Sequence, residues 1–260
     1  MKKWREIKDW HECWHCFKEV AQGIDKGTLE LGRRHYAQSV ALAAMQAVLC
    51  GYGKIAVVEL GVAHGDGLLD LCKSAKFLRN EFDIEVMVYG FDNAAGLPAP
   101  VDYRDHPEVW HERQFAMPDP DILRQKLPGF CQLVVGDVGD TIPDFAGHLK
   151  DTSLAFVSVD VDYYSSTKRA MGLFGFDAGC YLPAMPVYFD DMTTMLSWNE
   201  WCGEALAIRE FNEANALRKI TRKDNFNIPN FHALQVLDHP LRTGRQKPRP
   251  GFPLAVMPLR

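Results

Sequence analysis

Four aspartates follow two apolar segments in the second half of the chain. Asp160 and Asp162 come after one segment, and Asp190 and Asp191 come after the next. If these segments are neighbouring strands of a parallel sheet, their carboxyl ends meet at one edge, which is where open α/β sheets bind ligands. Carboxylates gathered there repel one another unless a cation lies among them, and Mg²⁺ is the expected ion. Such an ion favours ionisation of a substrate hydroxyl, while a free carboxylate removes the proton.

The alternative for these acids is structural. Asp160 or Asp162 would then cap the helix that follows, and Asp190 and Asp191 would be solvated loop residues. Two acid pairs on successive strands favour a site over this alternative.

The segment 59–67 (ELGVAHGDG) is a second candidate site. Glycines between a strand and a helix let a ligand lie against the backbone and the helix N-terminus. The dinucleotide fingerprint G-x-G-x-x-G is not met, because counting from Gly61 places Ala63 and Asp66 where its other glycines belong. Glu59, at the end of a buried strand, needs hydrogen bonds or a nearby cation, and a sulfonium ligand would supply positive charge.

Composition limits the classes of partner. The chain has 260 residues, 47% of them hydrophobic, and a formal net charge of −5, so we expect a small-molecule substrate and neither nucleic acid nor membrane as partner. Seven cysteines, an odd number in a domain of this size, indicate a reducing cytoplasm rather than a disulfide framework. Homo-oligomer formation is left open.

Hydrophobic patterning predicts alternating strands and helices. The expected strands are 55–60, 85–91, 132–137, 154–160 and 186–189, and the expected helices are 68–80, 119–126, 141–149, 165–174 and 201–217. An antiparallel pair is expected within 219–237. This order predicts an α/β, Rossmann-like fold with a mainly parallel sheet, helices on both faces and an antiparallel edge.

We expect three regions along the chain. Residues 1–53 form an N-terminal helical extension, 54–242 the core, and 243–260 an extended, proline-containing arm. Within the core, the long insertion 93–128 has the length of a functional loop.

Glu59, the glycine turn and Asp92 together resemble the signature of class I S-adenosylmethionine-dependent methyltransferases. The resemblance implies that the turn holds the methionine part of the cofactor and that Asp92 holds the ribose hydroxyls. Two vicinal hydroxyls are natural partners of one carboxylate.

The segments VSVDVDYYSSTK (157–168) and YFDD (188–191) resemble the macrocin O-methyltransferase family, metal-dependent sugar O-methyltransferases of natural product biosynthesis. The resemblance extends roughly from Val57 to Leu241. It implies a Mg²⁺-dependent O-methyltransferase acting on a hydroxyl of a small-molecule metabolite, with sugar-bearing metabolites as the implied substrates. The implied metal ligands are Asp160, Asp190 and Asp191, the general base is Asp162, and the cofactor-binding residues are Glu59, Gly61, Val62, Gly65, Asp92 and Asp137.

The chain departs from the family pattern at two places. Asp66 replaces a second glycine of the turn, and 182–186 (LPAMP) replaces a proline-glycine-glycine segment. These departures motivate an alternative, a non-catalytic cofactor- or metal-binding protein of the same fold. A nicotinamide-dependent oxidoreductase is a further alternative, which the glycine spacing disfavours.

Two polar clusters near the N-terminus are not expected to form sites. The first cluster is His11, Cys13, His15 and Cys16, which are too crowded on one helix for a tetrahedral zinc site. The second cluster is Arg33, Arg34 and His35, which we expect to face solvent.

Overall fold

A computed structural model describes residues 6–27, 30–192, 197–224, 228 and 230–247. Its centre is a seven-stranded sheet in the order β3-β2-β1-β4-β5-β7-β6. The strands are β1 (Lys54–Leu60), β2 (Glu85–Asp92), β3 (Cys131–Val135), β4 (Ser153–Val159), β5 (Ala184–Phe189), β6 (Arg218–Arg222) and β7 (Phe231–Val236). The first five strands of the chain pair in parallel, and β7 runs antiparallel to both β5 and β6. The predicted mainly parallel sheet with an antiparallel edge is confirmed.

The central strands are buried on both faces, which explains why their sequences do not alternate between apolar and polar residues. Every residue of β4 is buried, and so is all of β1 after Lys54. In the parallel register, Leu60 of β1 lies opposite Phe91 of β2 and Val159 of β4. The loops that follow these three strands therefore leave the sheet at one edge.

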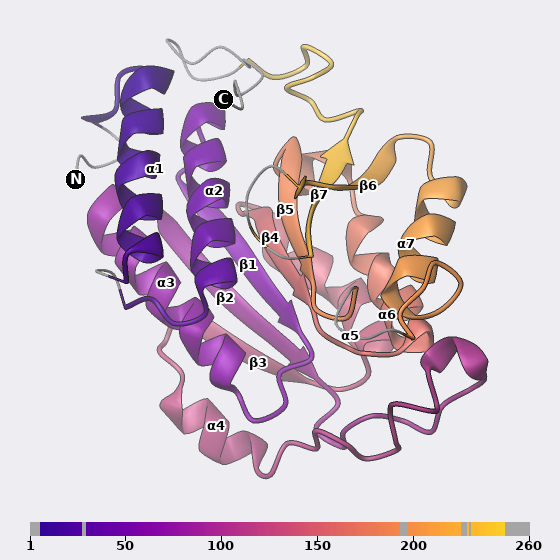
Figure 1. Ribbon diagram of the computed structural model, residues 1–260. Coiled ribbons are helices and arrows are strands. Elements are labelled where there is room, and N and C mark those ends of the chain that lie inside the picture. The colour runs from indigo at the N-terminus through magenta and orange to yellow at the C-terminus, as the bar shows by residue number, and fades with distance from the viewer. Residues whose placement is uncertain (1–5, 28–29, 193–196, 225–227, 229, 248–260) are drawn as a thin grey trace.

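Helices cover both faces of the sheet (Figure 1). The helices α1 (Trp10–Asp25), α2 (Arg34–Cys50) and α3 (Asp66–Phe82) lie on one side, and α5 (Val138–Phe145), α6 (Tyr164–Ala170) and α7 (Gly203–Ala214) lie on the other. The short α4 (Pro120–Lys126) follows the long loop that passes beneath the carboxyl ends of the strands. No helix within the described ranges is long and apolar enough to cross a membrane.

The N-terminal extension belongs to the layer that covers the sheet. Helix α2 packs between α1 and the strands β4 and β5, and 12 of its 17 residues are buried. It ends at Gly51, whose left-handed conformation (φ 84°) suits glycine. This packing brings the start of α2 to the carboxyl edge of the sheet.

Some predicted boundaries are off by a few residues, for local reasons. Helix α5 begins at Val138, three residues early, because Asp137 caps it. Helix α6 ends at Ala170 and continues as a 3₁₀ turn, Met171–Phe174. Of the arm predicted from Thr243, the structure describes 243–247, which form turns and bends, and the remainder lies outside the described residues.

Candidate functional site

A pocket of about 370 Å³ opens at the carboxyl edge of the sheet. Its wall is made by the loops after β1, β2, β3, β4 and β5, by the long loop before α4 and by the start of α2. Nine of the ten predicted site residues line it: Glu59, Gly61, Val62, Asp92, Asp137, Asp160, Asp162, Asp190 and Asp191. Gly65 lies in the same turn but outside the pocket lining.

The turn after β1 requires glycine for two different reasons. At Gly61 (φ 86°), a Cβ atom would lie 1.7 Å from the backbone oxygen of Asp160, so only glycine allows the loops after β1 and β4 to approach this closely. At Gly65 (φ 94°), a Cβ atom would lie 2.5 Å from the side chain of Leu123, so this glycine lets α4 pack against the turn. Both positions also have the left-handed conformation that glycine tolerates.

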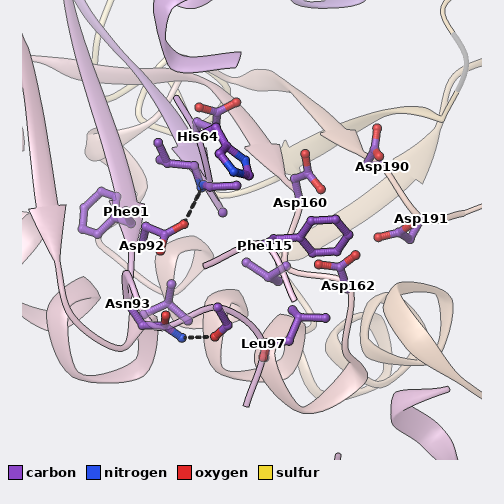
Figure 2. A pocket seen from close by; sticks show the side chains of 18 of the residues that line it. His64, Phe91, Asp92, Asn93, Leu97, Phe115, Asp160, Asp162, Asp190 and Asp191 are labelled. Atoms are coloured by element: carbon purple, nitrogen blue, oxygen red, sulfur yellow. Dashed lines mark hydrogen bonds between the residues drawn. The ribbon is translucent and has the colours of Figure 1, made fainter. Parts of the chain in front are cut away.

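Asp92 holds the glycine turn in place. Its Oδ2 accepts the backbone N–H groups of Val62 and Ala63, both at 2.8 Å, and its Oδ1 accepts that of Ala94 at 2.6 Å. Figure 2 shows this carboxylate at the side of the pocket opposite Asp160, Asp162, Asp190 and Asp191. Because a carboxylate oxygen accepts two hydrogen bonds, Oδ1 keeps one acceptor position for a ligand. Asp92 therefore orders the glycine turn, and its free acceptor position is compatible with the predicted contact to the ribose of the cofactor.

Asp137 has structural partners too. Its side chain accepts the N–H of Gly139 at 2.7 Å, which caps α5, and it forms an ion pair with Arg169 at 2.8 Å. The predicted contact with the adenine group of the cofactor stays a prediction.

Three of the four predicted acids converge. Asp160, Asp162 and Asp191 each offer a carboxylate oxygen, and these three atoms lie within 4.8 Å of one another (Figure 2). Oδ2 of Asp191 is buried and has no hydrogen-bond partner among the residues that the structure describes. Asp162 sits in the left-handed region (φ 56°), a conformation that Asp adopts more readily than most residues. A hard divalent cation such as Mg²⁺ fits an all-oxygen cluster with an unpaired buried carboxylate oxygen.

Burial and mutual repulsion alter the acidity of this cluster. Burial, followed by the charges of Asp190 and Asp191, raises the pKa of Asp160 to about 8. Burial, followed by the charges of Asp191 and Asp160, raises the pKa of Asp162 to about 9. For Asp191, burial and then the charge of Asp190 raise the pKa to about 7. A cation among these groups would remove the repulsion and restore their charged forms.

Asp190 lies in the same pocket but has a different environment. Its Oδ1 accepts the hydroxyl of Tyr188 at 2.7 Å, and its backbone oxygen accepts the side-chain amide of Asn230 at 2.8 Å. It is not one of the three acids whose oxygens converge. Its predicted role as a metal ligand therefore stays a prediction.

The prediction that the cluster Arg33, Arg34 and His35 faces solvent is wrong for two of its residues. Arg33 lines the pocket, with Nη1 3.9 Å from Oδ2 of Asp160. The ring of His35 is stacked on Tyr188, with 4.5 Å between the ring centroids. Arg34 does face solvent, with its side chain 63% exposed. Tertiary packing of α2, which the charge pattern does not reveal, accounts for the difference.

Sequence reasoning also missed Tyr36. Its hydroxyl donates to Oε1 of Glu59 at 2.9 Å and accepts from the hydroxyl of Ser158 at 2.8 Å. Glu59 is 1% exposed, and burial raises its pKa well above the usual range. Within the described part of the chain, its Oε2 has no hydrogen-bond partner. Tyr36 could have been found from two signals in the sequence, the need of Glu59 for a hydrogen-bond donor and the apolar periodicity of α2.

An aromatic wall faces the acids. Trp110 and Phe115, from the long loop before α4, line the pocket, with their ring centroids 5.7 Å apart. Phe115 has a left-handed backbone (φ 59°), is 44% exposed, and lies beside Asp160 and Asp162 in Figure 2. The backbone of this loop is fixed to Leu97, which exchanges hydrogen bonds with Arg113 and Gln114. Strain retained at a pocket wall suggests a binding role for this ring.

The sequence predicts no zinc site near the N-terminus. The residues concerned are ordinary residues of α1: His11, Cys13, His15 and Cys16. Cys13 and Cys16 are buried in the core, whereas His11 and His15 are exposed. The two pairs therefore point to different faces of α1.

No family model and no curated protein matches the chain. Solved structures do match. The crystal structure of CalS11, a calicheamicin methyltransferase, is 23% identical, with a TM-score of 0.52 over 84% of this chain and 91% of that one. The structure of the O-methyltransferase NovP is 17% identical, with a TM-score of 0.56 over 78% of this chain and 79% of that one. With the strand order above, this likeness establishes that the chain has the class I methyltransferase fold.

Proposed function

We propose that this protein is an S-adenosylmethionine- and Mg²⁺-dependent O-methyltransferase that methylates a hydroxyl group of a small molecule. The observation that carries the proposal is the convergence of Asp160, Asp162 and Asp191 in the same pocket as the glycine turn and Asp92. A methyl donor and an ion that binds hydroxyl oxygens belong side by side in such an enzyme. The names of CalS11 and NovP, both methyltransferases, agree with the proposal.

The residues divide into two groups. Glu59, the turn containing Gly61, Val62 and Gly65, and the carboxylates of Asp92 and Asp137 would hold S-adenosylmethionine, which supplies an electrophilic methyl group and departs as S-adenosylhomocysteine. Asp160, Asp190 and Asp191 would hold the divalent cation, which lowers the pKa of a hydroxyl bound to it.

Asp162 has the role of general base. It would accept the proton of the acceptor hydroxyl as the new O–CH₃ bond forms. Without a cation its raised pKa keeps it protonated at neutral pH and unable to do so. The base therefore depends on the charge balance of the whole cluster.

The acceptor would lie between these acids and the aromatic wall of Trp110 and Phe115. A sugar ring suits this space, because its hydroxyl edge can face the acids while its C–H face packs against an aromatic ring. We therefore propose a sugar-bearing metabolite of natural product biosynthesis as the acceptor.

Calorimetric titration with S-adenosylhomocysteine, with and without Mg²⁺, tests the donor half of the proposal. We expect binding of S-adenosylhomocysteine and no binding of NAD in the parallel titration. Absence of S-adenosylhomocysteine binding at millimolar concentration would remove the proposal. Transfer of a labelled methyl group to a panel of hydroxylated glycosides, with Mg²⁺ or with EDTA, tests the second half, and cofactor binding without transfer to any acceptor would favour the non-catalytic alternative.

A further inference from the structure

The peptide group that joins Asp190 to Asp191 is held at both of its polar atoms. Its carbonyl oxygen, which belongs to Asp190, accepts the side-chain amide of Asn230 at 2.8 Å. Its N–H, which belongs to Asp191, donates to Oε2 of Glu204 at 2.9 Å. Glu204 lies in the first turn of α7, and Asn230 is the residue before β7. Two segments that are far apart in the chain therefore fix one peptide group.

The parallel sheet does not reach this peptide. The N–H of Asp190 still donates to the backbone oxygen of Val159 at 3.1 Å, which continues the pairing of β5 with β4. Both strands end there, β4 at Val159 and β5 at Phe189, so the next peptide group lies beyond the sheet. Backbone groups in such a place need other partners, and the two side chains provide them.

The burial of Glu204 indicates that its carboxyl group has a polar role. The residue is 0% exposed, and its second oxygen, Oε1, has no hydrogen-bond partner among the described residues. A buried carboxyl group is costly, and an apolar side chain of similar size would fill the same space at lower cost. The hydrogen bond to the N–H of Asp191 is a role that an apolar side chain could not take.

The conformation of this peptide decides how the two neighbouring carboxylates point. Holding it restricts ψ of Asp190 and φ of Asp191, the two main-chain angles that set the relative direction of their side chains. The carboxylate of Asp191 converges with those of Asp160 and Asp162. Its Oδ2 has no hydrogen-bond partner in the part of the chain that the structure describes, so the direction of this oxygen depends on the main chain.

We propose that Glu204 and Asn230 are positioning residues of the metal site, which hold the Asp190–Asp191 peptide in the conformation that metal binding requires. The inference rests on the proposed function, because that function includes the divalent cation. Partners of this kind orient the ligands of a metal without touching it. The inference adds α7 and the start of β7 to the elements that build the site.

The test uses Mn²⁺ alone as the probe, with its affinity measured from the electron paramagnetic resonance signal of the free ion. Glu204→Ala and Asn230→Gly should each weaken Mn²⁺ binding by about ten- to a hundredfold, the usual effect of losing a partner that orients a metal ligand. Glycine suits position 230, because the backbone there is left-handed (φ 54°). The double variant should lose less than the product of the two single losses, because both side chains act on one peptide group.

Two further variants serve as controls. Glu204→Gln keeps an oxygen that can accept the N–H of Asp191, so its Mn²⁺ affinity should stay close to that of wild type. Glu213→Ala lies on the same helix, where its side chain is 71% exposed, and should also behave as wild type. Binding of S-adenosylhomocysteine, measured by calorimetry, should be unchanged in every variant, which separates a loss of positioning from a general loss of structure.

Each outcome decides the inference. Wild-type Mn²⁺ affinity in Glu204→Ala and in Asn230→Gly would overturn it, and so would a Glu204→Gln protein that binds Mn²⁺ as weakly as Glu204→Ala. Parallel losses of Mn²⁺ and S-adenosylhomocysteine binding would overturn it as well. Asn230→Gly decides the matter if Glu204→Ala does not fold.

Failure of the proposed function would look different. Wild-type protein that does not bind Mn²⁺ would remove the metal-dependent function and the inference with it. Wild-type protein that binds Mn²⁺ but not S-adenosylhomocysteine would remove the donor half of the function only. The Mn²⁺ affinities of the variants would then still decide the inference, with urea denaturation as the check that they are folded.

Discussion

The hydroxyl of Tyr36 in α2 lies 2.9 Å from Oε1 of Glu59 at the end of β1. This hydrogen bond joins the N-terminal extension to the strand that begins the core. Tyr36 is fully buried, and its hydroxyl also accepts from Ser158 on β4. The extension therefore helps to build the site, and changes in α2 should affect both stability and ligand binding.

Tyr36→Phe removes the donor to a buried carboxyl group. We expect the free energy of unfolding to fall by about 1 to 3 kcal/mol, the cost of leaving a buried polar group unsatisfied. Urea denaturation measures this change. Tyr52→Phe is the control, because the contacts of its hydroxyl with His239 and Gln246 are long, 3.4 Å and 3.5 Å. Equal midpoints for wild type and Tyr36→Phe would show that the bond contributes nothing.

The acid cluster predicts that stability depends on pH in the absence of metal. The raised pKa values of Asp160, Asp162 and Asp191, about 8, 9 and 7 against an ordinary 3.8, mean that the folded protein keeps protons that the unfolded chain releases. The free energy of unfolding should therefore fall as pH rises from about 4 to about 9.

Thermal melting in EDTA across this pH range checks the direction of the effect. With millimolar Mg²⁺ the decline should be smaller, because a bound cation takes the place of the protons. A melting temperature in EDTA that rises between about pH 6 and pH 8.5 would contradict the assignment, since these three groups require the opposite slope.

Asp162→Asn tests the general base. Asn tolerates the left-handed backbone of this position, so the variant should fold. Methyl transfer should fall by roughly 10²- to 10⁴-fold, the usual contribution of a general base, while S-adenosylhomocysteine binding is retained. Asp144→Asn, at an exposed position of α5, provides the control. An Asp162→Asn enzyme with full activity would show that another group takes the proton.

Removal of the proposed metal ligands should weaken metal binding. We expect Asp160→Asn, Asp190→Asn and Asp191→Asn each to reduce Mn²⁺ affinity by about tenfold or more, measured by the electron paramagnetic resonance signal of free Mn²⁺. Asp190 is the informative case, because it accepts a hydrogen bond from Tyr188 and lies outside the converging triplet. Unchanged Mn²⁺ affinity in Asp190→Asn would show that Asp190 is not a metal ligand and would assign that role to Asp162.

The sequence allowed the sheet to be predicted, and nine of the ten candidate site residues line one pocket, because both follow from local patterns. Unbroken apolar segments identified β1 and β4, and the acids after β4 and β5 reach one edge as parallel strands require. Packing between distant segments could not be predicted in this way. Arg33 and Arg34 are adjacent and chemically alike, yet only Arg33 lines the pocket, because the start of α2 is fixed against α3. The same holds for Phe115, which reaches the acids through a loop whose backbone conformation has no periodic signal.

The most direct test of the whole account is a crystal structure with S-adenosylhomocysteine and Mn²⁺, using anomalous scattering to locate the metal. We predict one Mn²⁺ peak bound by the carboxylates of Asp160, Asp190 and Asp191, with S-adenosylhomocysteine against the turn at Gly61 and its ribose at Asp92. S-adenosylhomocysteine in place with no Mn²⁺ peak among these acids would contradict the metal-dependent mechanism, and a ligand bound elsewhere would contradict the site itself.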